Sequence, residues 1–193
     1  MTRYRNMFGS IDDDPPILIC ADLQSEYLAE GRSHAISDAE AIMSRCLDLM
    51  TLWRDHLCPV MHLKRIAHAA WFNPASNLTN WIAELKPRPG ELAFEHPLPS
   101  AYSSARFAEY MANIRSLRCV MLGFSLDETI LATVVDGFHR SHRYQVVNDA
   151  VACRRAGVGD TDSYKKAVVR VIGNFAGITA SADLAGVARR IEV

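Results

Sequence analysis

Apolar and polar positions along the chain predict short strands that alternate with helices. Apolar runs bounded by polar turns, the clearest of them at 17–22, are typical of strands buried in a parallel sheet. The predicted strands are 17–22, 59–64, 91–96, 118–124, 144–149 and 177–181. Apolar residues spaced three and four apart predict the helices between them. The predicted helices are one that begins at Ser37, then 104–117, 126–140 and 161–174, and a short one at the end.

This alternation predicts one α/β domain built on a mostly parallel sheet. Residues 1–16 are polar and end in three aspartates and two prolines, so we assign them to an N-terminal arm and residues 17–193 to the single domain. Residues 65–90 are punctuated by prolines and a glycine, which predicts a loop with one helical turn near Trp81.

Two of the predicted helices begin with a capping-box pattern. Ser37 is followed three residues later by Glu40, and Ser125 is followed in the same way by Glu128. In a capping box, the serine and the glutamate satisfy backbone N–H groups at the start of the helix. The pattern predicts that Ser125 begins a helix directly after the fourth strand.

Composition narrows the function classes. The chain has 193 residues, 49% hydrophobic and 22% charged, and a net charge of −1, which leaves no electrostatic footprint for nucleic acid. No stretch is apolar enough for a signal sequence or a membrane span, so we expect no membrane partner. The cysteine count is odd and no C-x-x-C pair occurs, which predicts reduced thiols in a cytoplasmic protein. The cysteines are Cys20, Cys46, Cys58, Cys119 and Cys153.

Polar residues follow three of the predicted strands where each strand ends. Asp22 follows the first, His96 ends the third, and residues 125–129 follow the fourth. Ligands of parallel α/β sheets bind outside the carboxyl ends of the strands, so we expect these positions to converge. A buried aspartate can act as a general acid or base, and a histidine can exchange protons near neutral pH. The alternative reading of Asp22 is a turn residue, and that of His96 a partly exposed loop residue.

The chain resembles the isochorismatase-like hydrolases, also called the cysteine hydrolases. The resemblance rests on the segments 17–28, 81–102, 120–137 and 144–152, which include the Asp22-x-Gln24 signature and the turn Pro87-Arg88-Pro89-Gly90-Glu91. It implies a three-layer αβα sandwich around a six-stranded, mostly parallel sheet. It also implies a small-molecule substrate and assembly into homodimers or homotetramers.

The resemblance assigns roles to individual positions but leaves two of them altered. The family has an aspartate after the first strand, a lysine after the third and a cysteine after the fourth. These positions hold Asp22, His96 and Thr129 here, so only the aspartate is retained. Threonine is a poor nucleophile without a strong base beside it. The residues expected to contact substrate are Gln24, Tyr27, Trp71, Phe72, Tyr102, Ser125 and Leu126, although the Trp71–Phe72 pair also suits core packing.

Two functions are consistent with this altered set. The first is a hydrolase that cleaves a vinyl ether or an amide C–N bond by acid/base catalysis, as family members that cleave isochorismate do without the cysteine. The second is a catalytically silent relative that binds a small molecule or a protein. His56, His62 and His68 recur every six residues and share no helix face, so no metal site and no cofactor is predicted.

Overall fold

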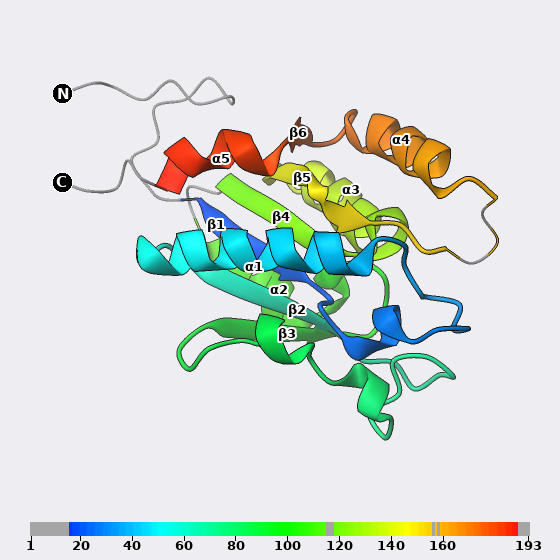
Figure 1. Cartoon of the computed structure of the whole chain (residues 1–193). Helices are drawn as coiled ribbons and strands as arrows, with labels where there is room; N and C mark the ends of the chain where they lie inside the picture. Colours follow the sequence, from blue (N-terminus) through cyan, green and yellow to red (C-terminus); the bar gives the residue numbers. More distant parts are fainter. Residues whose placement is uncertain (1–15, 115–117, 156, 158, 189–193) are drawn as a thin grey trace, which may run out of the picture.

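A computed structural model describes residues 16–114, 118–155, 157 and 159–188 (Figure 1). The strands are β1 (Ile17–Ala21), β2 (Val60–Arg65), β3 (Leu92–His96), β4 (Arg118–Phe124), β5 (Arg143–Ala152) and β6 (Gly177–Thr179). The helices are α1 (Ala39–Asp55), α2 (Ala105–Asn113), α3 (Leu131–His139), α4 (Thr161–Ile172) and α5 (Ser181–Ala188). The predicted arm, residues 1–16, lies outside the described residues except for Pro16.

The six strands form one sheet in the order β3-β2-β1-β4-β5-β6, and every neighbouring pair is parallel. Residues of α1 and α5 belong to the apolar core on one face of the sheet, and residues of α2, α3 and α4 belong to the core on the other face. In β1, Leu18 and Cys20 pack into the first core while Ile17 and Ile19 pack into the second. Both faces are therefore dry, which explains the unbroken apolar run. The predicted three-layer α/β class is confirmed.

The strand order changes direction between β1 and β4, and this switch point lies at the carboxyl edge of the sheet. Ala21 pairs with Gly123 there, and Gly123 has a positive φ of 109°. A Cβ atom at Gly123 would overlap the Ala21 backbone, so only glycine lets the two strands approach this closely. The residues that follow β1 and β4 are thereby brought side by side.

Neither predicted capping box forms, although a helical turn does begin directly after β4 with Ser125 as its N-cap, as predicted. The residue before α1 is Asp38, which has a left-handed φ of 54° and makes no side-chain capping bond. After β4, residues Leu126–Ile130 form one π-helical turn before α3, and Ser125 makes no side-chain capping bond either. Glu128 instead contacts cationic side chains outside its own turn. The competing partners explain why the local pattern fails here.

Several other boundaries differ from the predictions by a few residues. Strand β2 extends to Arg65, and β5 runs to Ala152 because it follows β4 to the end of the sheet. The helix predicted over 104–117 ends at Asn113, and 115–117 lie outside the described residues. Within the described part of the chain, no helix is both long and apolar enough to cross a membrane.

Candidate functional site

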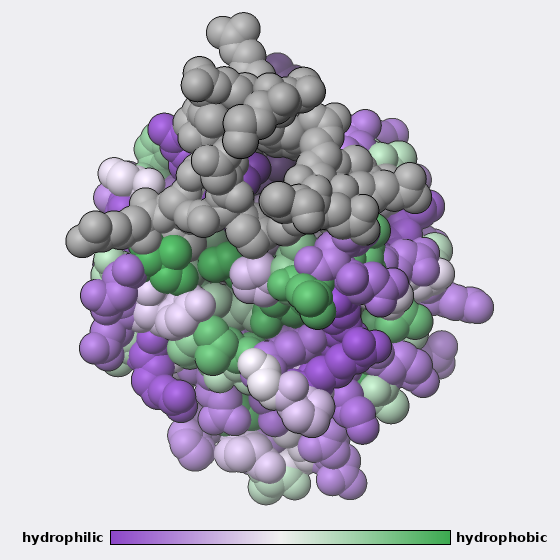
Figure 2. Space-filling view, turned by 90° about the vertical axis from the view of Figure 1, so that its left-hand side faces the viewer, coloured by the Kyte–Doolittle hydropathy of each residue, from purple (hydrophilic) through white to green (hydrophobic). Residues whose placement is uncertain are grey.

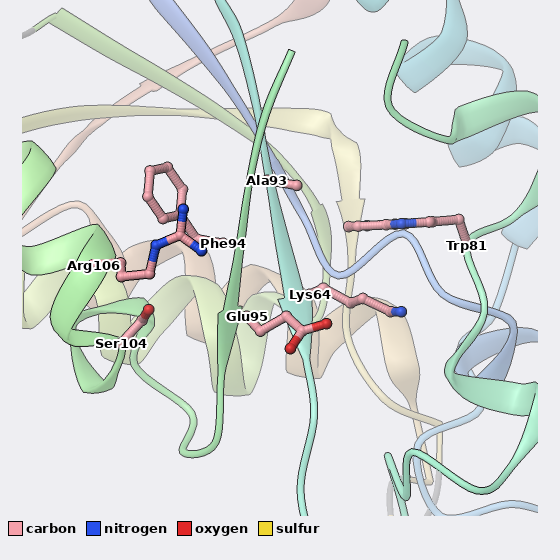
Figure 3. Close-up of a pocket in the computed structure, with 7 residues that line it drawn as sticks. All are labelled: Lys64, Trp81, Ala93, Phe94, Glu95, Ser104 and Arg106. Carbon is pink, nitrogen blue, oxygen red and sulfur yellow. The ribbon is translucent and has the colours of Figure 1, made fainter. Parts of the chain in front are cut away.

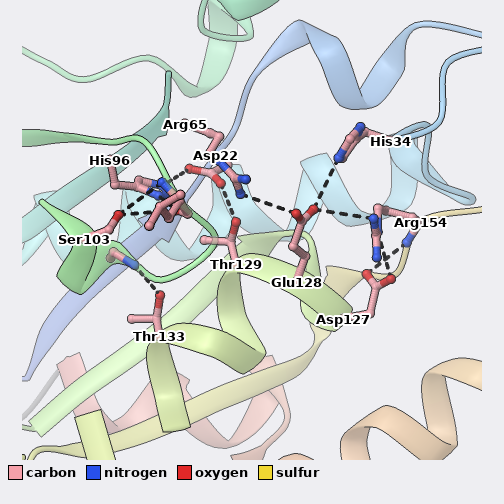
Figure 4. A network of polar contacts seen from close by, with 12 residues as sticks. Asp22, His34, Arg65, His96, Ser103, Asp127, Glu128, Thr129, Thr133 and Arg154 are labelled. Atoms are coloured by element: carbon pink, nitrogen blue, oxygen red, sulfur yellow. Dashed lines mark hydrogen bonds and ion pairs between the residues drawn. The ribbon is translucent and has the colours of Figure 1, made fainter. Parts of the chain in front are cut away.

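Asp22 is the centre of a buried polar cluster at the switch point (Figure 4). It follows β1 directly, has a left-handed φ of 44°, and its side chain has no exposed surface. Oδ1 lies 2.9 Å from His96 Nε2, and Oδ2 accepts a hydrogen bond of 2.7 Å from the Thr129 hydroxyl. The structure therefore brings together the three residues that follow or end separate strands.

His96 is held by oxygen atoms on both sides of its ring. It ends β3 and is 1% exposed, so it is not a solvent-facing loop residue. Nδ1 lies 2.7 Å from the Leu98 carbonyl oxygen, which can only accept, so Nδ1 carries a proton. The short contact between Nε2 and Asp22 then requires a second proton between them. The pair therefore holds one proton in reserve.

The pKa of His96 is consistent with this arrangement. Burial lowers the pKa of the imidazole, but the charge of Asp22, the hydrogen bond to it and the Leu98 carbonyl together raise it above 6.5. Below this raised pKa the ring is cationic and lies next to the Asp22 carboxyl group. In that form His96 supplies a positive charge and a proton to the site.

Thr129 lies in the π-helical turn Leu126–Ile130, and its side chain is fully buried. Its hydroxyl donates to Asp22, while the Ile130 backbone N–H donates to the Ser125 carbonyl oxygen. The Ser125 hydroxyl is also buried and has no hydrogen-bond partner among the described residues. This turn therefore presents two hydroxyl groups at the carboxyl edge, only one of which is engaged.

Arg65 and Glu128 extend the cluster away from His96, and the sequence analysis did not single them out. The Arg65 guanidinium lies between Asp22 and Glu128 in Figure 4, with Nη1 3.5 Å from Glu128 Oε1. Glu128 also lies 3.3 Å from His34 Nε2 and 3.6 Å from Arg154 Nη1. The His34 hydrogen bond and both arginines lower the pKa of Glu128 against the effect of its burial.

A signal for Arg65 was present in the sequence. The predicted second strand stopped at residue 64, one residue short, which placed Arg65 in a loop. A charged residue that ends a buried strand in a parallel sheet lies at the ligand-binding edge. Glu128 was assigned to the capping box, and no local pattern distinguishes a capping glutamate from one with distant partners.

The predicted substrate-contact residues fall into different places. The Gln24 amide is fully engaged, since it donates to the Arg65 and Thr79 carbonyl oxygens and accepts from the Arg65 backbone N–H. It therefore braces the ends of β1 and β2. Tyr27 is fully buried, and its hydroxyl has no hydrogen-bond partner among the described residues. Burial and the charges of Asp22 and Glu128 raise the pKa of Tyr27 well above its ordinary range.

Phe72 and Trp71 cover the Arg65 side of the cluster. Phe72 is 2% exposed, and the Arg65 guanidinium carbon lies 5.4 Å from the centre of its ring. Trp71 is 39% exposed and packs its ring 5.5 Å from that of His34. Leu126 is buried in the apolar core between the sheet and helices α2, α3 and α4. Trp71 is thus the part of this aromatic cover that meets solvent.

Tyr102 is a correction to the predicted set. Its hydroxyl bonds to Tyr144 and His142, and its ring packs against Phe107 in the core. Tyr144 lies at the beginning of β5, so the Tyr102 hydroxyl points toward the amino ends of the strands. The side chain therefore turns away from Asp22.

None of the five cysteines offers an activated nucleophile. All five are free and buried. Burial raises the pKa of Cys46, Cys119 and Cys153 to about 12, so these thiols stay protonated at neutral pH. In the described residues, no group of three His, Cys, Asp or Glu side chains converges as a metal site would require.

A separate pocket of about 580 Å³ lies on the outer edge of the sheet (Figure 3). Lys64, Trp81 and Glu95 lie on one side of β3 in this view, and Ser104 and Arg106 lie on the other. It shares no lining residue with the Asp22 cluster. We do not assign it to the candidate site.

The fold and the cluster define a class of protein: a parallel α/β domain with a buried carboxylate–imidazole pair at its switch point. The family model described as "Isochorismatase domain" matches residues 16–183. The chain belongs to the isochorismatase family, as its resemblance implied. A comparison with curated proteins gives no match.

Solved structures of the family share this fold. An isochorismatase from Pseudomonas putida is 23% identical, with 89% of this chain and 90% of that chain covered and a TM-score of 0.79. A hydrolase of the isochorismatase family from Chromobacterium violaceum is 20% identical, with 93% and 96% covered and a TM-score of 0.81. N-carbamoylsarcosine amidase from Thermoplasma acidophilum is 22% identical, with 86% and 96% covered and a TM-score of 0.67.

Proposed function

We propose that this protein hydrolyses a small molecule by acid/base catalysis at the Asp22–His96 pair, without a covalent intermediate. The bond cleaved is a vinyl ether or an amide C–N bond. The contact of 2.9 Å between Asp22 Oδ1 and His96 Nε2, with the Leu98 carbonyl on the other ring nitrogen, is the observation that carries this proposal. It supports a proton that is stored in the site and available to a substrate.

For a vinyl ether, Asp22 transfers this proton to the terminal carbon of the double bond. The resulting oxocarbenium ion is attacked by water, and the hemiketal that forms collapses to an alcohol and a carbonyl compound. The proton that water loses returns to the Asp22–His96 pair, so the pair ends the cycle as it began. His96 passes its Nε2 proton to Asp22 and becomes a neutral imidazole, so the Asp22 carboxylate that remains after proton transfer balances the positive charge of the oxocarbenium ion.

Thr129 does not act as the nucleophile in this mechanism. A nucleophilic hydroxyl needs a base within hydrogen-bond reach, and the carboxylate that the Thr129 hydroxyl contacts is Asp22 Oδ2, at 2.7 Å. In this mechanism Asp22 donates a proton to the substrate and does not take one from Thr129. Thr129 instead orients the Asp22 carboxylate.

Substitutions at Asp22 and Thr129 test the mechanism directly. Asp22→Asn should lower turnover by about 100- to 10,000-fold, because an amide cannot exchange the proton. Thr129→Ala should lower it less than about tenfold, within the range of a single lost hydrogen bond. Asp149→Asn is the matched control, since that carboxylate lies on β5 and bonds to Ser181. Turnover is measured on a panel of enol ethers and small amides.

Two results would overturn the proposal. If Thr129→Ala is as damaging as Asp22→Asn, and mass spectrometry traps an adduct on Thr129, the threonine is the nucleophile. If the wild type is inactive on the whole panel while Thr129→Cys with His96→Lys hydrolyses an amide, the protein is a binding module. Circular dichroism of each variant verifies that the fold is retained.

A further inference from the structure

Arg65 is a buried cation without a tight partner. The residue is 8% exposed, and its Nε and Nη1 atoms make no hydrogen bond with the described residues. Its nearest carboxylate is Glu128, at 3.5 Å through Nη1 alone. Buried arginines are normally paired, because an uncompensated charge in the interior is strongly unfavourable.

Two other arginines in the same molecule form bidentate ion pairs with carboxylates. Arg32 holds Glu26 through two bonds of 2.7 and 3.0 Å, and Arg54 holds Glu91 through two bonds of 2.7 and 2.9 Å. Both pairs have the forked geometry that matches a guanidinium to a carboxylate. Arg65 is more buried than Arg32, but among the described residues it makes a single ion-pair contact, and that contact is longer.

We propose that Arg65 binds a carboxylate group of the substrate, and that this carboxylate displaces the side chain of Glu128. The proposal rests on the proposed function, because it identifies the substrate class of the same site. The Arg65 guanidinium lies between Asp22 and Glu128, so a carboxylate held by it lies next to the proton donor (Figure 4). The substrate is accordingly a small carboxylic acid.

The surroundings of Arg65 offer hydrogen-bond donors to an added carboxylate. Phe72 lies against the guanidinium and leaves its edge, where the N–H groups are, free to donate. The buried Tyr27 hydroxyl has no hydrogen-bond partner among the described residues, and the Tyr27 ring packs 5.4 Å from that of Phe72, so Tyr27 offers one further donor on this side. The Asp22–His96 pair, with its shared proton, is neutral overall. When Glu128 withdraws, Arg154 and His34 remain as its partners.

Carboxylate recognition is tested by calorimetric titration with pairs of probes that differ only in charge. Benzoate, cyclohexanecarboxylate and pyruvate are each compared with their primary amides. We expect the wild type to bind at least one carboxylate more tightly than its amide. Arg65→Gln should lower the affinity for that carboxylate by about 10- to 100-fold and leave the affinity for the amide unchanged. Arg45→Gln is the matched control, because Arg45 is 48% exposed and pairs with Asp149.

Glu128→Gln gives the opposite expectation and separates recognition from a structural role. Removal of the competing carboxylate should tighten carboxylate binding several-fold, whereas a site held together by Glu128 would bind less. Tyr27→Phe should lower the affinity for the same carboxylate about two- to tenfold, as expected for one lost hydrogen bond. Equal binding of carboxylates and amides, or weaker binding in Glu128→Gln, overturns the proposal.

The outcome is independent of the catalytic test. Titration measures binding without turnover, so it can be repeated in Asp22→Asn. If Asp22→Asn retains turnover but Arg65→Gln loses carboxylate binding, the mechanism is wrong and the substrate class stands. If Asp22→Asn is inactive and Arg65→Gln binds carboxylates normally, the mechanism stands and the substrate class is wrong.

Discussion

At the scale of single residues, His96 gives the site a pH dependence. Its pKa is raised above 6.5 because the carboxylate of Asp22 and the Leu98 carbonyl outweigh its burial. The stored proton is therefore present below this raised pKa and is lost as the pH rises through it. We expect kcat/KM to fall on the alkaline side, with the midpoint above 6.5. A pH–rate profile on an active substrate measures it.

A matched variant identifies the group responsible for this alkaline limb. His96→Lys should move the limb to higher pH, because the ordinary pKa of lysine is about 10.4. His96→Gln should remove the limb together with most of the activity. A profile that is unchanged in His96→Lys would assign the titration to another group. The same sign holds for folding: His96 contributes stability below pH 6.5, and this contribution is lost as the pH rises through its folded value.

The residues of the site could be predicted from the sequence only where position along a strand decides their place. Asp22 and His96 end or follow strands, so the topology alone places them at one edge. To predict the place of Arg65, the end of β2 has to be located to within one residue, and the apolar pattern does not locate it that closely. Glu128 matches a capping box, yet its partners His34, Arg65 and Arg154 come from other parts of the chain.

At the scale of elements, the central strands β1 and β4 were predictable because both faces of the sheet are dry there. The loop between β2 and β3 was less so. It contains two short 3₁₀ turns, Asn77–Thr79 and Ala83–Leu85, on either side of the turn expected near Trp81. Gln24 fixes part of this loop through the Thr79 carbonyl. Such a side-chain bond over 55 residues leaves no local pattern.

The turn before β3 is fastened to α1 by a part-buried ion pair. Glu91 accepts two bonds from Arg54, and it also contacts His62 and the Arg88 backbone N–H. Burial raises the pKa of Glu91, but these donors lower it to about 2. Its contribution to stability is thus complete above pH 4.5 and is lost as the pH falls toward 2.

We expect Arg54→Met to destabilise the protein by about 1–3 kcal/mol at pH 7, because it leaves the part-buried Glu91 carboxylate without its main partner. The loss should be smaller at pH 4, where an unpaired Glu91 can take up a proton. Urea unfolding at both pH values measures the difference. Arg45→Met, which breaks an exposed pair, should change stability by less than about 1 kcal/mol. Equal losses at the two pH values would contradict the role of Glu91.

At the scale of the whole molecule, the site and the amino ends of the strands lie at opposite ends of the sheet. Figure 2 looks onto the amino ends, where hydrophobic and hydrophilic residues are intermixed on the visible surface. The site end is closed instead: Asp22, Ser125 and Thr129 have no exposed surface. A substrate therefore reaches Asp22 only when part of this cover moves, and displacement of Glu128 is one such movement.

The outer surface of α3 carries an apolar stripe that suits contact between subunits. Leu131 and Val135 are partly exposed, and Phe138 is 51% exposed, at spacings of four and three residues along one helix face. We predict that the protein forms at least a dimer through this stripe, since burial of apolar surface drives association. Light scattering at micromolar concentration should give at least twice the chain mass of 21.5 kDa.

Phe138→Glu tests whether α3 forms the contact. In the dimer the introduced charge would have to be buried without a partner, so light scattering should give the mass of a monomer. The monomeric variant should still unfold cooperatively in urea, because Phe138 lies on the surface of the subunit. Leu57→Glu is the control, because Leu57 is 93% exposed and does not belong to the stripe. A monomeric wild type, or a Phe138→Glu variant that keeps the wild-type mass, would contradict this interface. A Leu57→Glu variant that dissociates would move the interface to the turn after α1.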